Sequence, residues 1–343
     1  MKHISKYETI RRILSAFKQP KYRYAQIMDA IFKQNIGHYE QMTILPKFLR
    51  DELTRELGLS VCSIVPVKEL MSKQVSKVLF SIAGGEHIEA VQLKYEQGWK
   101  SYCISTQCGC GFKCRFCATG TIGLKRNLAA EEITDQLLYF RLNGHALDSV
   151  SFMGMGEALA NPHLFDALSI LTDPLLFGLG HRRITVSTIG LLPGIDRLTR
   201  EYPQVNLTFS LHSPFDEQRS ELMPINDHFP LRDVLEALDR HIQLTGRKVY
   251  IAYILLRGVN DSAAHAEAVA NLLRGRGPVE HLYHVNLIPF NSTEVTPENY
   301  EQSDTEQIKA FVRILKSKGI STTVRTQFGS DINAACGQLY RSR

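Results

Sequence analysis

Apolar residues in the first seventy positions recur at the spacing of an α-helix. Within residues 21–34, four apolar side chains fall on one helical face: Ala25, Met28, Ile31 and Phe32. A second segment, residues 46–57, begins with Pro46 and is followed by Gly58, which are typical start and stop residues. The pattern predicts a small helical domain in this part of the chain.

The spacing changes at residues 77–95, where apolar and polar residues alternate on both sides of Gly84 and Gly85. Alternation around a glycine pair is typical of a β-hairpin. Glu89 falls in the second arm of this predicted hairpin.

From residue 98 onward, predicted strands and helices alternate. Six largely apolar segments predict strands: 101–105, 148–154, 183–188, 205–211, 248–256 and 283–289. Between them, apolar residues recur at helical spacing, as in 130–142, 232–242 and 308–315. Strands that are apolar throughout and separated by helices indicate a parallel sheet buried on both faces. The six units predict an α/β fold, an incomplete (β/α)6 barrel, and a flat doubly wound sheet is the alternative.

Charge is unevenly distributed along the 343 residues, although the net charge is only +5. Residues 1–74 hold thirteen Lys and Arg against seven Asp and Glu, which leaves about −1 for the rest of the chain. A basic domain beside a near-neutral one indicates a polyanionic partner, and a solvated helical surface is the alternative. No apolar run approaches the length of a membrane span, and the start of the chain lacks the apolar core of a secretory signal. We therefore expect a cytoplasmic protein without a membrane partner.

Four of the seven cysteines lie within eleven positions. Cys110, Cys114 and Cys117 follow a C-x3-C-x2-C spacing shortly after the first predicted barrel strand. A structural zinc site requires four ligands, and no second Cys or His pair is placed to complete a tetrahedral site. Three thiolates can instead bind three irons of a [4Fe–4S] cluster, leaving the fourth iron for the amino and carboxylate groups of a small molecule. Cys108, two residues before Cys110, is a spectator in this interpretation.

The next predicted strand ends in a glycine-rich turn, "GMGE", at residues 154–157. Such a turn exposes backbone groups and the Glu157 carboxylate at the edge of the sheet. Alone it is more often a tight turn than a ligand site. At the strand that follows the cysteine loop, it becomes a candidate for binding an amino group.

Three further stretches narrow the interpretation: "CISTQCGC" (103–110), "FSLHSP" (209–214) and "VRTQFGSDINAACGQL" (324–339). With "RNLAAEEITDQ" and "LMPIN", they make nearly the whole chain resemble the Cfr-type and RlmN-type adenosine methyltransferases of large-subunit ribosomal RNA. These belong to the radical S-adenosylmethionine (SAM) superfamily. The resemblance implies a [4Fe–4S] cluster on Cys110, Cys114 and Cys117. It implies SAM contacts from these residues: Gly156, Glu157, Ser187, Ser210, Leu211, His212 and Asn291.

The resemblance also implies three catalytic residues. Cys336 would carry a methyl group taken from one SAM, and a radical from a second SAM would activate that methyl group for attack on the base. Cys103 would release the product by forming a disulfide with Cys336, and Glu89 would transfer a proton. Taken without the resemblance, Cys336 is a small buried hydrophobic residue, Glu89 an exposed strand residue and His212 a satisfied core histidine.

The resemblance divides the chain into four parts. These are a basic helical RNA-binding domain at 1–74, a hairpin with Glu89 at 75–97, the partial barrel at 98–330 and a segment with Cys336 at 331–343.

The "TQFG" before "SDINAACGQL" resembles the type that methylates C8 of adenine rather than C2, although no physical argument selects C8. The implied substrate is an adenosine in the peptidyl-transferase region of 23S rRNA, in protein-free or early-assembly RNA. The implied result is resistance to phenicols, lincosamides, oxazolidinones, pleuromutilins and streptogramin A. An electron donor such as flavodoxin or ferredoxin is implied too. The alternatives are a C2-directed methyltransferase and a non-catalytic Fe–S or zinc protein that binds RNA.

Overall fold

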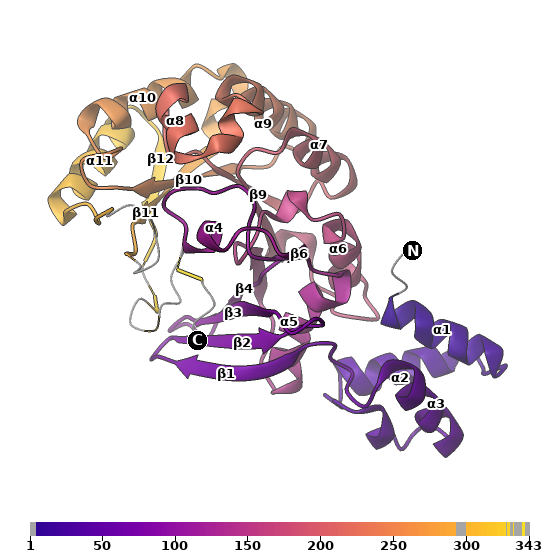
Figure 1. The fold of residues 1–343 in the computed structure, drawn as a ribbon. Helices are drawn as coiled ribbons and strands as arrows, with labels where there is room; N and C mark the ends of the chain where they lie inside the picture. The colour runs from indigo at the N-terminus through magenta and orange to yellow at the C-terminus, as the bar shows by residue number, and fades with distance from the viewer. Residues whose placement is uncertain (1–4, 293–299, 327, 330–331, 333–337, 340–343) are drawn as a thin grey trace.

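The computed structural model describes residues 5–292, 300–326, 328–329, 332 and 338–339 (Figure 1). Its first part is a group of helices, α1 (Lys6–Ala16), α2 (Tyr22–Phe32) and α3 (Lys47–Leu57). The helices predicted at 21–34 and 46–57 are thereby confirmed. Among the described residues, no helix has both the length and the apolar character required to cross a membrane.

Three antiparallel strands follow, β1 (Val65–Met71), β2 (Val75–Ser81) and β3 (His87–Lys94). The hairpin predicted around Gly84 and Gly85 is β2–β3. The strand β1 differs from the helical structure expected up to residue 74. It is an exposed edge strand held by pairing with β2, so its side chains need no alternation that a sequence pattern could detect. The domain boundaries proposed from the sequence stay predictions.

The six predicted barrel strands are all confirmed: β4 (Lys100–Cys103), β7 (Ser149–Phe152), β8 (Ile184–Thr188), β9 (Asn206–Ser210), β10 (Val249–Leu255) and β11 (Tyr283–Pro289). A further strand, β12 (Ser321–Val324), pairs in parallel with β11. The short strands β5 (Gln107–Cys108) and β6 (Arg126–Asn127) form a separate ribbon beside the barrel.

The strands of the main sheet follow chain order from β1 to β12, without β5 and β6. The pairing of β4 with β3 is antiparallel, and every pairing from β4–β7 to β11–β12 is parallel. A doubly wound sheet would reverse its strand order at a switch point. Here the order does not reverse, so the crossovers place the helices on one side and the sheet curves into an open barrel. The helices lie along its outer side (Figure 1): α5 (Ala130–Leu142), α6 (Leu164–Thr172), α7 (Leu192–Glu201), α9 (Leu231–Thr245), α10 (Ala263–Arg274) and α11 (Thr305–Ser317). Two short helices, α4 (Ala118–Ile122) and α8 (Asp216–Leu222), lie near the strand ends.

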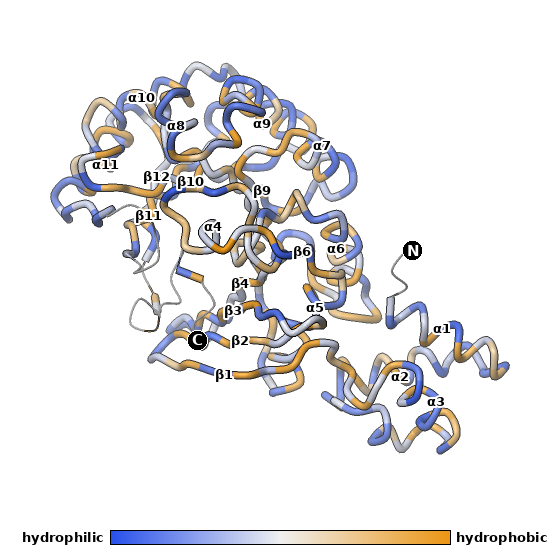
Figure 2. Tube along the Cα trace, in the orientation of Figure 1, coloured by the Kyte–Doolittle hydropathy of each residue, from blue (hydrophilic) through white to orange (hydrophobic). Residues whose placement is uncertain are grey.

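The two faces of the barrel strands differ in polarity, which corrects the expectation of a sheet buried on both faces. In β8, Ile184, Val186 and Thr188 are buried under the helices, whereas Thr185 and Ser187 on the other face are half-buried. The same alternation of half-buried and buried positions runs through β7 and β11. Figure 2 shows both hydrophilic and hydrophobic residues along the outer helices, such as α9 and α10. The concave face of β7, β8 and β11 is therefore only half-buried, and it is not a filled core.

The N-terminal helices share one continuous hydrophobic core with the barrel. The ring of Phe32 packs edge-on against Phe177, with centroids 4.9 Å apart. The buried carboxylate of Asp135 on α5 accepts hydrogen bonds from the backbone N–H and hydroxyl of Ser63 at 2.7 and 2.8 Å, and pairs with the Lys6 ammonium group. The helices are thus fixed to the outside of the barrel by packing and by a buried ion pair.

Candidate active site

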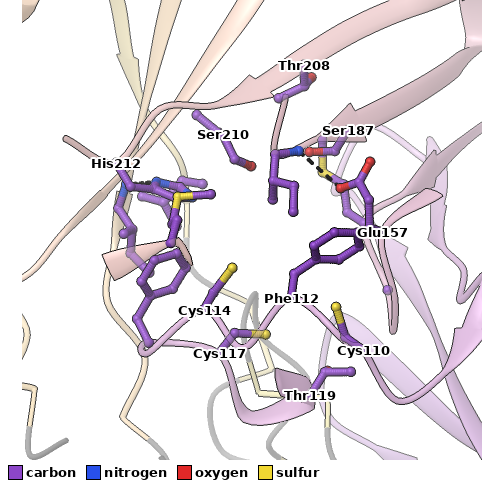
Figure 3. A pocket seen from close by; sticks show the side chains of 18 of the residues that line it. Cys110, Phe112, Cys114, Cys117, Thr119, Glu157, Ser187, Thr208, Ser210 and His212 are labelled. Carbon is purple, nitrogen blue, oxygen red and sulfur yellow. Dashed lines mark hydrogen bonds between the residues drawn. The ribbon is translucent and has the colours of Figure 1, made fainter. Parts of the chain in front are cut away.

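The cysteine loop crosses one end of the barrel, between β5 and α4. Figure 3 shows Cys110, Cys114 and Cys117 with their sulfur atoms directed into one cavity. The loop places Phe112 and Phe116 in the wall of the same cavity. The three predicted ligands are therefore brought together, at the end of the sheet where the parallel strands terminate.

The surroundings of the thiols fit a cationic iron cluster. Burial raises the pKa of Cys110 to about 12, despite hydrogen bonds from backbone N–H groups. Burial, and the neighbouring cysteines in addition, raise the pKa of Cys114 well above its usual value. Three thiolates cannot be held this close in a desolvated loop without positive charge between them, which iron supplies. Among the described residues, no three His, Cys, Asp or Glu side chains are arranged around the position of a single metal ion.

The glycine-rich turn brings the end of β7 against the end of β4. A Cβ atom at Gly154 would lie 2.6 Å from the carbonyl oxygen of Ile104, which is backbone and cannot rotate away. Gly156 has a φ of +96°, and a Cβ there would lie 2.5 Å from the Cβ of Gln107. Only glycines permit this approach, which places the backbone of residues 154–157 beside the cysteine loop.

Glu157 extends from this turn into the cavity wall (Figure 3). Its carboxylate accepts hydrogen bonds from the backbone N–H groups of Leu159 (3.2 Å) and Ile189 (3.0 Å). Burial raises the pKa of Glu157 to about 7. A buried carboxylate with this little compensation favours a cationic partner such as an amino group.

Other predicted SAM contacts reach the same cavity. Ser187, Ser210 and His212 project from the ends of β8 and β9 into its wall. His212 has a φ of 55°, its Nδ1 accepts the backbone N–H of Ile254 at 3.0 Å, and burial lowers its pKa to about 3. The His212 ring is therefore neutral, and it is buried from bulk solvent while it lines the cavity.

Two predicted contacts lie outside the wall of this cavity. Leu211 is fully buried in the core behind β9, and its backbone N–H donates to the carbonyl of Ala252 at 3.0 Å. Asn291 is buried beyond the end of β11, two residues after Pro289. Their contacts with SAM stay predictions.

Strand pairing places Cys103 and Glu89 on the concave face. Cys103 pairs with Ser151 of β7, whose face is shared by Met153 in the cavity wall. Cys103 also lies opposite Val91 of β3, and Glu89 is two residues from Val91 on the same side of that strand. The two residues are thus diagonal neighbours on the face that leads to the cavity. Cys336 lies outside the described residues, so its distance from Cys103 is not tested.

Glu89 is fully buried, so the alternative of an exposed strand residue is wrong. Its carboxylate forms an ion pair with the Lys77 ammonium group at 3.1 Å, and Lys77 is almost as buried. The ammonium group of Lys77 thereby offsets part of the cost of burying this carboxylate. Glu89 and Cys103 do not belong to the described wall of the cysteine cavity.

Three residues that the sequence interpretation did not single out contribute to the site. Arg325 and Asn286 line the cavity, and an Arg325 N–H group donates to the sulfur of Met153 at 3.6 Å. Arg219 on α8 lies fully buried behind the cavity. Asn286 lies in the predicted strand 283–289, and Arg325 lies in the stretch 324–339. Both would have been found by assigning which residues of these segments face the inside of the barrel. No sequence signal marks Arg219.

Comparisons with known proteins agree with this geometry. Residues 104–270 match the Radical SAM superfamily. Ribosomal RNA large subunit methyltransferase Cfr from Lachnoclostridium phytofermentans is 59% identical over 335 residues, or 98% of this chain and 97% of that protein. The protein of the same name from Shouchella clausii is 60% identical over 339 residues, 98% and 96% of the two chains. The crystal structure of a radical SAM methyltransferase from Sphaerobacter thermophilus has a TM-score of 0.90 at 42% identity, over 98% of this chain and 97% of that chain. The chain therefore belongs to the Cfr family of ribosomal RNA large subunit methyltransferases, within the radical SAM superfamily.

Proposed function

We propose that the protein methylates C8 of an adenosine in the peptidyl-transferase region of 23S rRNA. The added methyl group would hinder phenicols, lincosamides, oxazolidinones, pleuromutilins and streptogramin A, which bind there. One observation carries the proposal: three cysteine sulfurs and Glu157 face one cavity in a chain about 60% identical to relatives named for rRNA methylation.

The cofactors of this enzyme are a [4Fe–4S] cluster and SAM. Cys110, Cys114 and Cys117 would hold the cluster, and with SAM it supplies the one-electron chemistry that can functionalise an unreactive carbon such as C8 of adenine. The backbone of Gly156 and the carboxylate of Glu157 would bind the amino group of SAM. The hydroxyl groups of Ser187 and Ser210 would orient the rest of SAM.

Cys336 and Cys103 have complementary roles in the proposal. The Cys336 thiolate would accept the methyl group and form the covalent bond to the base. Cys103 would break that bond by forming a disulfide with Cys336. Cys103 is half-buried on the concave face, which supports access from the hollow of the barrel rather than from bulk solvent.

Glu89 would remove the proton from the methylated base. Its carboxylate is the candidate proton acceptor, and the Lys77 ammonium group lies beside it at 3.1 Å. It lies diagonal to Cys103 on the same face, so proton removal and bond cleavage would occur side by side.

We also propose the setting of the reaction. The basic residues of 1–74 would contact phosphates of 23S rRNA before or early in ribosome assembly, when the target adenosine is accessible. A flavodoxin or ferredoxin system would supply electrons in the cytoplasm.

Mass spectrometry of nucleosides from the 23S rRNA of expressing cells tests the function. We expect 8-methyladenosine with the unmodified protein and none with Cys336→Ala or Cys103→Ala. Cys62→Ala is the matched control, because Cys62 packs near Asp135 at the N-terminal interface, away from the cavity. Accumulation of 2-methyladenosine alone would establish the C2-directed alternative. Unmodified rRNA, with RNA binding independent of Cys336, would establish a non-catalytic RNA-binding protein.

A further inference from the structure

Below the cysteine cavity, the concave face of the barrel continues as a polar surface. Side chains on this face toward the strand starts are half-buried and polar, among them Ser149, Asn206, Tyr250 and His284. His284 contacts the hydroxyl groups of Ser321 and Thr323 across β11 and β12 at 2.8 and 3.0 Å. The four residue steps from Ser149 in β7 to Met153, just after the end of β7, span about 13 Å. Half-buried polar side chains therefore line the concave face from the start of the strands to the cavity wall.

The edge of the barrel at the strand starts, here called the rim, is basic. Because the strands are parallel, their starting ends meet at the same edge of the sheet. Five cations occur there, at or just before the strand starts or at the end of α11: Lys100, Arg182, Arg183, Lys248 and Lys318. In the part of the chain that the structure describes, none of these five side chains forms an ion pair. Acidic residues occur at this end as well, and Asp148 is engaged by the backbone N–H of Lys100 at 2.8 Å.

The net charge of the barrel part of the chain does not reveal this basic rim. Residues 75–343 carry a net charge of about −1, so the sequence drew attention only to the N-terminal helices. Acids elsewhere in residues 75–343 offset the basic rim in the sum. Cations without carboxylate partners at one edge favour a polyanion.

An exposed aromatic ring lies at the same edge. Trp99 is 43% exposed, and its indole N–H donates to the hydroxyl of Ser149 at 3.1 Å. The guanidinium carbon of Arg183 lies 5.6 Å from the centre of the indole ring. The ring is thus held in place by two polar partners while much of its surface is open to solvent. A fixed aromatic ring beside an arginine is a stacking platform for an unpaired base.

We propose that this edge, the starting ends of the barrel strands, is the entrance through which the RNA substrate reaches the active site. This inference rests on the proposed function. RNA phosphates contact the rim cations, an unpaired base stacks on Trp99, and the target nucleotide extends along the polar face toward Cys103. The opposite end of the barrel carries the cysteine loop and α4. The distance from the rim to the cavity requires the target nucleotide to leave its stack, because a base in a duplex resting on the rim ends short of the cavity.

Equilibrium binding of a labelled 23S rRNA fragment containing the target adenosine, at several salt concentrations, tests the inference. We expect Arg183→Gln/Lys248→Gln to weaken binding roughly tenfold and to reduce the log–log salt slope by about 1.4 to 1.8, since each lost phosphate contact contributes about 0.7 to 0.9. We expect Trp99→Ala to weaken binding about tenfold and Trp99→Phe to retain most of the affinity. Arg232→Gln/Lys309→Gln, which removes two exposed cations from the outer helices, is the matched control and leaves the slope unchanged.

The outcomes separate this inference from the proposed function. Unchanged affinity and salt slope in the rim variants, together with wild-type thermal unfolding, would overturn the entrance and leave methylation intact. Rim variants that bind RNA weakly would support the entrance even if the unmodified protein formed no methyladenosine. In that case only the proposed function would fail. Cleavage of SAM by the reduced protein without RNA should be equal in all variants, which shows that the cavity is undisturbed.

Discussion

Replacing Arg219 tests how the cavity is held together from behind. Its side chain is fully buried, and the guanidinium group donates to four acceptors: the carbonyl oxygens of Ile189 (2.8 Å), Ser210 (3.1 Å) and Leu211 (3.2 Å), and Oδ1 of Asn226 (2.7 Å). Ile189 directly follows β8, and Ser210 is the last residue of β9. One side chain therefore fixes the two strand ends that carry predicted SAM contacts.

The magnitude follows from competing terms. Burying a guanidinium group is costly, and replacing a buried charge with a well-packed apolar residue can even stabilise a protein. Here Arg219→Met would leave four buried acceptors without donors, at about 1 to 3 kcal/mol each when considered singly. Because neighbouring losses are not additive, we expect a net cost of about 4 kcal/mol. Arg219→Lys retains the charge but not the planar fork, and we expect about half that cost.

Thermal unfolding and equilibrium dialysis with SAM measure the two consequences. For a chain of this size, 1 kcal/mol corresponds to about 2 °C, so Arg219→Met should lower the melting temperature by about 8 °C. The affinity for SAM should fall more in Arg219→Met than in Arg219→Lys. Arg232→Met, on the exposed side of α9, should change neither. A melting temperature within a degree of the unmodified protein, with unchanged SAM affinity, would refute the reasoning.

Three further outcomes are expected. Gly154→Ala should cost about 1 to 3 kcal/mol and weaken SAM binding, because the new Cβ meets the backbone of Ile104, whereas Gly180→Ala, with open space around it, should do neither in the same melting and dialysis assays. Burial lowers the pKa of His241 from 6.5 to about 4, so stability should fall by about 3 kcal/mol as the pH drops from 6.5 to below 4; melting curves of His241→Asn should lack this loss. Asp135→Asn should cost about 3 to 5 kcal/mol and expose the N-terminal helices to limited proteolysis, because Lys6 loses its buried partner. A digestion rate equal to that of the unmodified protein would contradict that last expectation.

Periodicity predicted the helices and the six central strands because those elements bury one face. The helix at 130–142 and the strand at 283–289 have the boundaries that the structure shows. The strand β1 escaped detection, because it is exposed and depends on β2 for pairing. The polarity of the concave face was visible as alternating serines and threonines, but short apolar runs dominated the interpretation.

The site was predictable where residues lie close together in sequence. The cysteine loop and the turn at 154–157 are such local signals. The ion pair between Lys77 and Glu89 depends on strand pairing, and the role of Arg219 depends on three loops meeting at one side chain. Contacts of this kind are set by tertiary packing, which one sequence does not specify.

The rigid attachment of the N-terminal helices to α5 has a consequence for substrate choice. With Lys6 and Asp135 paired in the interface, the distance from these helices to the mouth of the barrel is constant. An RNA bound by both the helices and the barrel would present only the nucleotide that lies at this fixed separation, whatever the adjacent bases are. Substrate selection would then depend on the shape of the folded RNA more than on its base sequence.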